Sequence, residues 1–310
     1  MEQRQHQSIQ KLIAEIEKVV IGKREVIEMT VAALLAGGHV LFEDIPGVGK
    51  TVLVKTLAKA IQGEFSRVQF TPDLQPSDIS GLSIYNEESR RFEFRPGPIF
   101  TTVLLADEIN RTPPRTQAAL LEAMSEKHVT IDNQTYPLDE HFFVLATQNP
   151  VEYEGTYPLP EAQLDRFLFR LKIGYPVYED ELVLLLGQQE QALAHVQSVL
   201  TKEQLIRLKQ QVSEVTVSNQ VSRYGLNLIR ATREHAGVRL GISPRGGIAF
   251  LRGAQAYAFV HGRDFVTPED LQAVMGPVFG HRLILNYGED KEKILKEILA
   301  SVLVPVRKKS

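Results

Sequence analysis

The residue types and spacing best suited to chemistry lie at positions 39–52, where an apolar run leads into a loop with Gly47 and Gly49, followed by Lys50 and Thr51. Glycines allow the main chain to approach phosphate groups closely. The backbone N–H groups of such a loop and the N-terminus of the helix after it both favour anions. Lys50 would then contact the β- and γ-phosphates of a nucleotide, and the Thr51 hydroxyl would bind Mg²⁺.

One position in this loop departs from the general phosphate-loop pattern. The pattern begins with glycine, whereas this chain has Asp44 at that place. The flanking segments fit the pattern, because the apolar run 40–42 predicts a buried strand and a helix is expected from about Lys50 to Ile61. An ordinary turn between a strand and a helix is the alternative interpretation.

A second apolar run, at 103–106, predicts a buried strand that ends in the adjacent carboxylates of Asp107 and Glu108. In open α/β sheets, ligands bind at the carboxyl ends of the strands. Asp107 can hold Mg²⁺ there, while Glu108 can orient and deprotonate an attacking water molecule. Two solvated acids in a turn are the alternative, which the preceding phosphate loop makes the weaker one.

Two further polar residues follow predicted elements in ways that suit a nucleotide site. Asn149 ends the strand expected at 142–149, where its side chain would lie beside the γ-phosphate, although asparagine is also common in turns. Arg245 lies at the start of a predicted helix, where the helix dipole disfavours a cation. A nearby anion would explain this placement, and a surface arginine is the alternative.

The composition is that of an ordinary globular protein of 310 residues, with 43% hydrophobic and 24% charged residues. This length suggests one large domain with a smaller one, or two of medium size. The absence of cysteine excludes disulfides, thiolate zinc sites and cysteine nucleophiles. A net charge of −3 provides no overall field that attracts nucleic acid. No apolar run is long enough to span a bilayer and the first residues do not form a secretory signal, so a cytoplasmic protein is expected.

Periodicity and turn residues divide the rest of the chain. Apolar residues at helical spacing predict two N-terminal helices, at 9–20 and 24–35. Two excursions interrupt the predicted sheet, at about 80–98 and at 128–138, and the second has the pattern of a hairpin. A Tyr-Pro pair ending at Pro176 marks the expected domain boundary. The helices expected beyond it lie at about 179–197, 202–214, 221–236, 244–261, 268–276 and 290–303.

Taken together, these motifs resemble the MoxR family of AAA+ ATPases. The matching segments span most of the chain and occur in the family's order, which makes the series far more specific than any single motif. Aspartate in place of the first glycine is familiar within MoxR proteins. The segments are Glu43–Thr51, Ala106–Pro114, Ala118–Met124, Ala146–Pro150, Glu154–Phe167 and Ser243–Gly246.

The resemblance implies that this chain binds ATP and Mg²⁺. Thr51 and Asp107 match the metal ligands of the family, and Glu108 matches its catalytic carboxylate. The segment Val20–Gly22 matches the wall on the adenine side. The nucleotide-binding residues that it implies are Val20, Ile21, Gly22, Pro46, Gly47, Val48, Gly49, Lys50, Thr51 and Val52.

The resemblance also implies roles for residues outside the phosphate loop. Asn149 is similar to sensor 1, which helps to position the attacking water, and Arg245 is similar to sensor 2 in the lid. Arg166 is similar to the arginine finger, which reaches the nucleotide of a neighbouring subunit. Arg170 is a second candidate for that role.

The fold that the resemblance implies is α/β: a P-loop AAA+ αβα core with a five-stranded parallel sheet, followed by an all-α C-terminal lid domain. The core would cover residues 1–176 and the lid residues 177–310. The excursion at 80–98 would be the helix-2 insert of this clade, and the one at 128–138 would be the hairpin before sensor 1. The assembly would be a homo-oligomer in the form of a hexameric ring.

The implied function is ATP hydrolysis by a chaperone-like remodeller of protein partners, among them a protein with a von Willebrand factor A domain. A nucleic-acid motor is one alternative, because related helix-2-insert ATPases include replicative helicases and the arginines at 90–95 would place basic groups at a pore. The negative net charge disfavours it. A second alternative function is a nucleotide-dependent scaffold without hydrolysis. Glu108, Asn149 and Arg166 argue against this alternative, because each is useful mainly for hydrolysis.

Overall fold

The structure is a computed structural model, and it describes residues 2–149, 155–187 and 189–305. A sheet of five strands lies at its centre, in the order β2-β5-β8-β1-β9, and all neighbouring strands run parallel. The five-stranded parallel sheet expected from the MoxR resemblance is therefore confirmed. The strands are β1 (Val40–Glu43), β2 (Phe65–Gln69), β5 (Val103–Asp107), β8 (Phe143–Gln148) and β9 (Phe169–Leu171).

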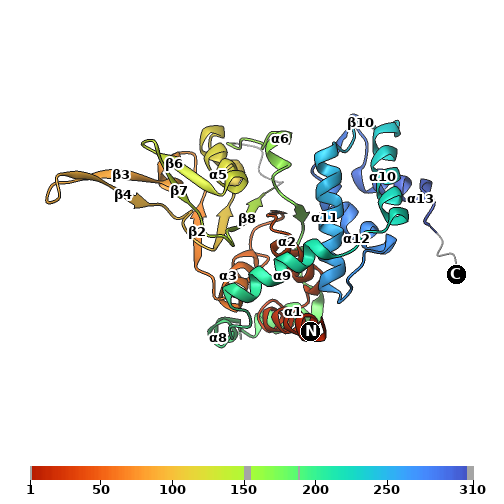
Figure 1. The fold of residues 1–310 in the computed structure, drawn as a ribbon, viewed down its shortest axis with the longest axis horizontal. Helices are drawn as coiled ribbons and strands as arrows, with labels where there is room; N and C mark the ends of the chain where they lie inside the picture. The colour runs from red at the N-terminus through yellow and green to blue at the C-terminus, as the bar shows by residue number, and fades with distance from the viewer. Residues whose placement is uncertain (1, 150–154, 188, 306–310) are drawn as a thin grey trace.

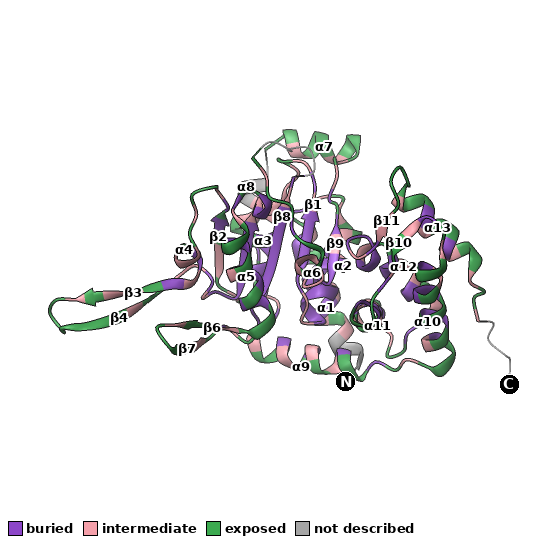
Figure 2. Ribbon diagram, turned by 90° about the horizontal axis from the view of Figure 1, so that it is seen from above, coloured by how far each residue is buried: buried purple, intermediate pink, exposed green. Residues whose placement is uncertain are grey.

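The central strands are apolar at successive positions because helices cover both faces of the sheet (Figure 1, Figure 2). Consecutive strand residues point to opposite faces, so Leu104 and Leu105 belong to two different clusters of buried side chains. The helices around the first cluster are α1 (Glu2–Glu17), α2 (Arg24–Leu35) and α3 (Lys50–Ala60), and α5 (Pro114–Glu126) covers the second.

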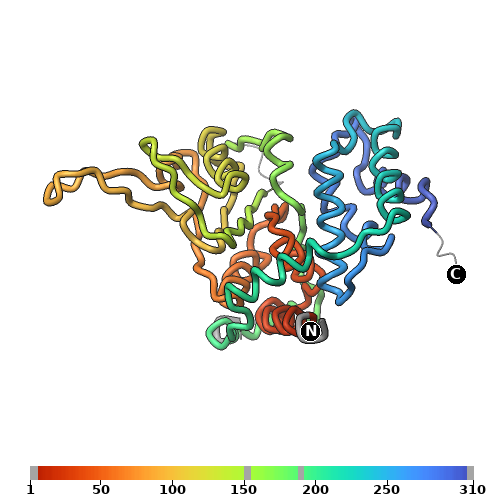
Figure 3. Tube along the Cα trace, viewed as in Figure 1, coloured from red at the N-terminus to blue at the C-terminus, as the bar shows by residue number. Residues whose placement is uncertain are grey.

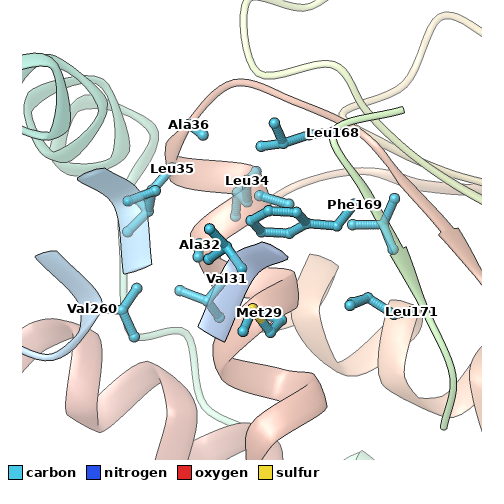
Figure 4. Packing of buried hydrophobic residues seen from close by; sticks show 14 of the residues in the cluster. Met29, Val31, Ala32, Leu34, Leu35, Ala36, Leu168, Phe169, Leu171 and Val260 are labelled. Carbon is cyan, nitrogen blue, oxygen red and sulfur yellow. The ribbon is translucent and has the colours of Figure 1, made fainter. Parts of the chain in front are cut away.

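The N-terminal helices lie between the sheet and the C-terminal helices, as the course of the chain in Figure 3 shows. α11 (Pro244–Val260) packs against both α1 and α2. Figure 4 shows this region from close by, with Val31 of α2, Phe169 of β9 and Val260 of α11 in one buried cluster. Burial of such apolar surface stabilises by roughly 25 cal/mol per Å², so it joins the C-terminal helices to the sheet.

Two antiparallel hairpins leave the sheet, and the first projects far from the rest of the molecule in Figure 1 and Figure 2. Phe94 of the first stacks on Tyr136 of the second, with ring centroids 4.0 Å apart. Aromatic packing therefore joins the two hairpins. Their strands are β3 (Gly81–Asn86) with β4 (Arg91–Pro96), and β6 (His128–Ile131) with β7 (Gln134–Pro137).

The C-terminal part is mainly helical, as expected, but it differs from the prediction in two places. The helix expected at 179–197 is two helices, because Gly187 adopts a left-handed φ of +76° directly after the first of them. Two short strands also pair antiparallel, so the part expected to be all helix contains a small sheet. The domain boundary expected at Pro176 falls between β9 and α7 and stays a prediction.

The elements of this part are α7 (Tyr178–Leu185), α8 (Gln189–Ala194), α9 (Lys202–Glu214), α10 (Asn219–Glu234), β10 (Val238–Leu240), α12 (Pro268–Phe279), β11 (Ile284–Leu285) and α13 (Lys291–Ser301), with α11 before α12. Three short elements complete the core. They are α4 (Pro76–Ser80), the 3-10 helix η1 (Ile109–Arg111) and α6 (Glu161–Leu164). Among the helices that the structure describes, none has the length and apolar character needed to cross a membrane.

Two buried histidines link elements of the fold. His39 precedes β1, and its Nδ1 accepts the N–H of Val144 at 3.0 Å, so its proton is on Nε2, which lies 3.3 Å from the carbonyl oxygen of Met124. Burial lowers the pKa of His39 to about 4. Burial also lowers the pKa of His281 well below its usual value, and its Nε2 lies 2.9 Å from the carbonyl oxygen of Phe167.

We predict that the free energy of unfolding falls as the pH is lowered from about 6.5 to about 4. In this window the unfolded chain binds protons at its histidines that the folded chain excludes, so stability present above pH 6.5 is lost progressively. The His39 share is on the order of 3 kcal/mol at about pH 4. Urea unfolding across this window measures it.

His39→Gln is the matched variant, because glutamine keeps a donor and an acceptor but does not titrate. The variant should show a smaller loss of unfolding free energy across the same pH window. An unchanged pH dependence in His39→Gln would mean that His39 contributes none of the acid sensitivity.

Candidate nucleotide-binding site

The loop between β1 and α3 has the backbone that a phosphate-binding loop needs. Gly47 and Gly49 have left-handed φ values of +84° and +91°, which other residues rarely adopt. A Cβ at either position would meet no atom within 4 Å, so open space lies beside both. α3 begins at Lys50 without a side-chain cap, so its first N–H groups are available to an anion.

A pocket of about 240 Å³ lies in front of this loop, at the carboxyl edge of the sheet. The predicted residues Lys50, Thr51, Asp107, Glu108 and Asn149 all line it. Their convergence from distant parts of the sequence follows from the parallel strands, whose carboxyl ends meet at one edge. The lining residues are Asp44, Pro46, Gly47, Gly49, Lys50, Thr51, Arg67, Gln69, Asp107, Glu108, Thr147, Gln148 and Asn149.

Lys50 is held at the mouth of the loop by main-chain oxygens. Its Nζ donates to the carbonyl oxygens of Asp44 at 3.1 Å and Ile45 at 2.7 Å. Partial burial lowers the pKa of Lys50, and nearby carboxylates, led by Asp44, act in the opposite direction. Because both acceptors are neutral, the ammonium can exchange them for phosphate oxygens, which bind a cation more strongly.

Thr147 of β8 orders the acid pair at the end of β5. Its hydroxyl donates to Asp107 Oδ1 at 2.6 Å and accepts the N–H of Glu108 at 2.7 Å. Glu108 has a φ of +57°, an uncommon conformation for a residue with a side chain. Sequence analysis missed Thr147, although it lies in the polar end of the strand that leads to Asn149.

Further groups bind the outer oxygens of the two carboxylates. Asp107 Oδ2 forms an ion pair with Arg67 at 2.6 Å. Glu108 Oε2 accepts hydrogen bonds from Gln69 Nε2 at 2.7 Å and from Arg111 at 3.0 Å. Sequence analysis also missed Arg67 and Gln69, whose alternate positions on β2 place both side chains on one face of the sheet.

A second cavity, of about 320 Å³, adjoins the phosphate pocket, and Gly47 and Gly49 line both. Its lining is largely apolar, which suits a purine base. The predicted Gly22 is absent from the lining, and a Cβ there would clash with Asp180 of α7. The contribution of α7 was not predicted. The lining residues are Val19, Val20, Ile21, Lys23, Gly47, Val48, Gly49, Val52, Tyr175, Pro176, Glu181, Leu184 and Leu185.

Comparisons with known proteins agree with this geometry. The profile of the "ATPase family associated with various cellular activities (AAA)" matches residues 39–169, and an AAA lid domain profile matches residues 230–298. Chaperone MoxR1 of Mycobacterium tuberculosis is 40% identical over 303 residues, which cover 94% of this chain and 80% of that protein. The chain belongs to the MoxR family of AAA+ ATPases.

Two further comparisons extend the agreement over the core and the C-terminal helices. The protein YeaC of Bacillus subtilis is 50% identical, over 98% of this chain and 97% of that protein. A crystal structure of a protein from Cytophaga hutchinsonii matches with a TM-score of 0.91 and 41% identity, covering 98% of this chain and 97% of that one. The arrangement of lid and core is therefore shared with a solved structure of high similarity.

Membership of the family implies nucleotide binding, with Mg²⁺ as the usual partner ion. The described residues contain no group of three or more His, Cys, Asp or Glu that could hold a metal without a ligand. The pocket nevertheless fits Mg²⁺, because Thr51 and Asp107 supply oxygen donors on its wall. Mg²⁺ is commonly held by one or two protein groups together with substrate phosphates and water, and these donors match that pattern.

The predicted arginines do not line the nucleotide pocket of their own chain. Arg166 precedes β9, at the amino edge of the sheet, and its Nε donates to Ser125 Oγ at 2.8 Å. Arg245 Nε lies 3.3 Å from Oδ2 of Asp165, the residue that precedes Arg166. Arg170 pairs at 3.1 Å with the carboxylate that ends β1. Arg166 and Arg245 thus share a surface at the edge opposite the pocket.

Asp44 has a structural role that explains the departure from the general loop pattern. It is 8% exposed, and its Oδ2 accepts the N–H groups of Ile173 at 2.5 Å and Gly174 at 2.7 Å. Its Oδ1 accepts the N–H of Ile45 at 2.9 Å. The carboxylate therefore ties the phosphate loop to the chain that leaves β9, which glycine has no side chain to do.

We predict that Asp44→Ala lowers the free energy of unfolding by about 2–4 kcal/mol, because it leaves the N–H groups of Ile173 and Gly174 without their acceptor. Asp44→Asn keeps one carbonyl acceptor and should lose less. Denaturant unfolding measures both variants. Equal stability of Asp44→Ala and the unchanged protein would contradict the structural role of this carboxylate.

Proposed function

We propose that this protein hydrolyses ATP as a subunit of a homo-oligomeric ring and uses the cycle to remodel protein partners. The observation that carries the proposal is the convergence of Lys50, Asp107 and Glu108 on one pocket beside an apolar cavity. A cation for the phosphates, a carboxylate for Mg²⁺ and a candidate base are the parts that hydrolysis requires. The naming of a MoxR relative as a chaperone supports the remodelling part.

Glu108 is the proposed base for the attacking water. Its side chain is 22% exposed on the pocket wall, where water can reach it. Gln69 and Arg111 hold Oε2, so Oε1 is the oxygen proposed to accept the proton. Asn149 lines the same pocket and would orient the water beside the γ-phosphate. Mg²⁺ at the predicted ligands would neutralise charge on the phosphates.

Glu108→Gln should bind Mg·ATP with little change in affinity and hydrolyse it at least about 100-fold more slowly, because an amide keeps the shape but cannot accept the proton. Lys50→Ala should instead lose nucleotide binding, because it removes the charge that meets the phosphates. Calorimetry measures affinity and phosphate release measures turnover. Undiminished hydrolysis by Glu108→Gln would exclude it as the base.

Arg166 is proposed to act in the site of a neighbouring subunit. It lies at the amino edge of the sheet, whereas the pocket of its own chain lies at the carboxyl edge. An arginine supplied by a second subunit can stabilise the charge that develops on the transferred phosphoryl group. Arg245, which pairs with Asp165, is proposed to face the same neighbour.

Arg166→Ala should bind ATP and lose turnover by about 1,000-fold or more. A mixture with Glu108→Gln protein should recover part of the activity, because some interfaces then combine an intact Glu108 with an intact Arg166. The activity of each variant assayed alone is the control. Exchange of fluorescently labelled subunits shows that mixed rings form. Exchange without recovered activity would contradict a shared site.

The tip of the β3–β4 hairpin is proposed to contact protein cargo. Phe92 is 74% exposed and Tyr85 is 50% exposed, and their rings meet edge to face at 5.4 Å. Phe94 instead packs against Phe100 and Tyr136, so it supports the hairpin. Exposed aromatic side chains favour protein interfaces. The MoxR resemblance makes a protein with a von Willebrand factor A domain the first partner to test.

The charge of the same hairpin weighs against the nucleic-acid motor. Its arginines at 90, 91 and 95 are balanced by glutamates at 87, 88 and 93. A surface that follows a phosphate backbone is instead rich in uncompensated cations. Stimulation of hydrolysis by DNA that persists at physiological salt would revive the motor interpretation.

Phe92→Ala should leave basal hydrolysis near normal, because Phe92 lies far from the pocket, but it should weaken capture of a partner in the Glu108→Gln background. Tyr287→Ala is the matched control, because it removes a fully exposed aromatic side chain from the C-terminal part. Capture is measured by co-purification with the von Willebrand factor A protein. Equal capture by both variants would place the partner site elsewhere.

A further inference from the structure

The C-terminal part of the chain holds the segment that carries Arg166. Arg282 lies in the loop between α12 and β11, and its side chain is 5% exposed. Its Nε donates to Asp165 Oδ1 at 2.6 Å, and its Nη2 donates to the carbonyl oxygens of Phe167 at 2.8 Å and Asp165 at 3.2 Å. Its Nη1 donates to the carbonyl oxygen of Leu168 at 3.2 Å. One buried guanidinium therefore fixes the backbone on both sides of Arg166.

Two other side chains of the C-terminal part contact the same short segment. His281 is neutral, because burial and the adjacent guanidinium lower its pKa, and its Nε2 donates to the carbonyl oxygen of Phe167 at 2.9 Å. Arg245 Nε lies 3.3 Å from the free side of Asp165, at Oδ2. The contact is therefore built from three side chains of the lid and one continuous segment of the core.

This contact lies apart from the nucleotide pocket of the same chain. Neither Arg282 nor any residue of 165–168 is among the described residues that line it. The Arg166 side chain donates a hydrogen bond to Ser125 of α5, and Arg282 binds the carbonyl oxygens of its two neighbours in the chain, Asp165 and Phe167. A group that stabilises a transition state loses much of its effect when it is displaced by about 1 Å, so the backbone anchor matters for chemistry in the next subunit.

We propose that Arg282 is a positioning residue for Arg166, and that it links the orientation of the lid in one subunit to catalysis in the neighbouring subunit. This inference rests on the proposed function, in which Arg166 acts in trans. The planar guanidinium binds several acceptors in a fixed arrangement, so movement of the lid carries the 165–168 backbone with it. Arg166 then approaches or leaves the neighbouring nucleotide.

The test uses full-length protein in mixed rings. Arg282→Lys keeps the charge but cannot reach all the acceptors at once, so it should bind Mg·ATP normally and lose turnover by at least about 10-fold. Mixed with Glu108→Gln, it should recover activity, because it supplies Glu108 and its neighbour supplies a well-placed Arg166. Mixed with Arg166→Ala, it should show no gain over the separate proteins, because both lack a working arginine.

Asp165→Asn is the second variant, and it should follow the same mixing pattern with a smaller loss. Arg263→Ala is the matched control, because Arg263 pairs with Asp270 inside the lid rather than with the 165–168 segment. The ATP turnover of Arg263→Ala should be the same with either mixing partner. General destabilisation of the lid would affect the turnover of the Arg282 and Arg263 variants alike.

Several outcomes would overturn the inference. Recovery of Arg282→Lys with Arg166→Ala, rather than with Glu108→Gln, would place the defect in its own nucleotide site. Two other results would mean that the contact only attaches the lid to the core. One is that Arg282→Lys regains ATPase activity with neither partner, and the other is that Arg282→Lys and Asp165→Asn both fail to fold. If the mixture of Arg166→Ala and Glu108→Gln also regains no ATPase activity, both the proposed trans function of Arg166 and the inference about Arg282 are contradicted. If that mixture does regain activity, only the inference about Arg282 is contradicted.

Discussion

The candidate nucleotide pocket depends on the place of β8 between β1 and β5. The parallel register aligns Ala146 with Leu41 on one side and with Ala106 on the other, so the three strands end at one edge. Thr147 then meets the carboxylate of Asp107 and the backbone of Glu108. A slip of one residue would turn Thr147 to the opposite face and leave the acid pair without this support.

Lys50, Asp107 and Glu108 each have a polar or charged partner within the protein. Lys50 donates to carbonyl oxygens, Asp107 pairs with Arg67, and Glu108 accepts from Gln69. Burial of an unpaired charge is costly, so these partners stabilise the pocket. Because each group is still partly exposed, a nucleotide and its metal ion would exchange these contacts for new ones.

The two edges of the sheet have different tasks. The carboxyl edge carries the phosphate loop and the acid pair, and the amino edge carries Arg166 beside Asp165. A contact that joins the two edges of different subunits would be heterologous, and such contacts close into rings when the rotation permits. Arg282 adds a direct connection between the lid and the amino edge. The candidate binding site thus lies at one edge of the sheet, and the contact with the lid lies at the other.

Residue patterns in the sequence predicted the phosphate loop and the acid pair, and the resemblance to the MoxR family predicted the five-stranded sheet that carries them. Residues adjacent in the chain, such as Lys50 and Thr51, or Asp107 and Glu108, form these features, so a short-range pattern is enough to find them. The order of the motifs also identified the family. The departure at Asp44 was recognised from the sequence, but its physical reason was not.

Only the tertiary structure decided which groups surround these residues. Strand order brought Arg67 and Thr147 to the acid pair, and the turn after β9 brought Ile173 to Asp44. Packing of the C-terminal helices placed Arg245 at the edge opposite the phosphate loop, and it buried Arg282 against the chain beside Arg166. Such contacts join residues far apart in the chain. They depend on strand order and domain packing, which short-range residue patterns do not specify.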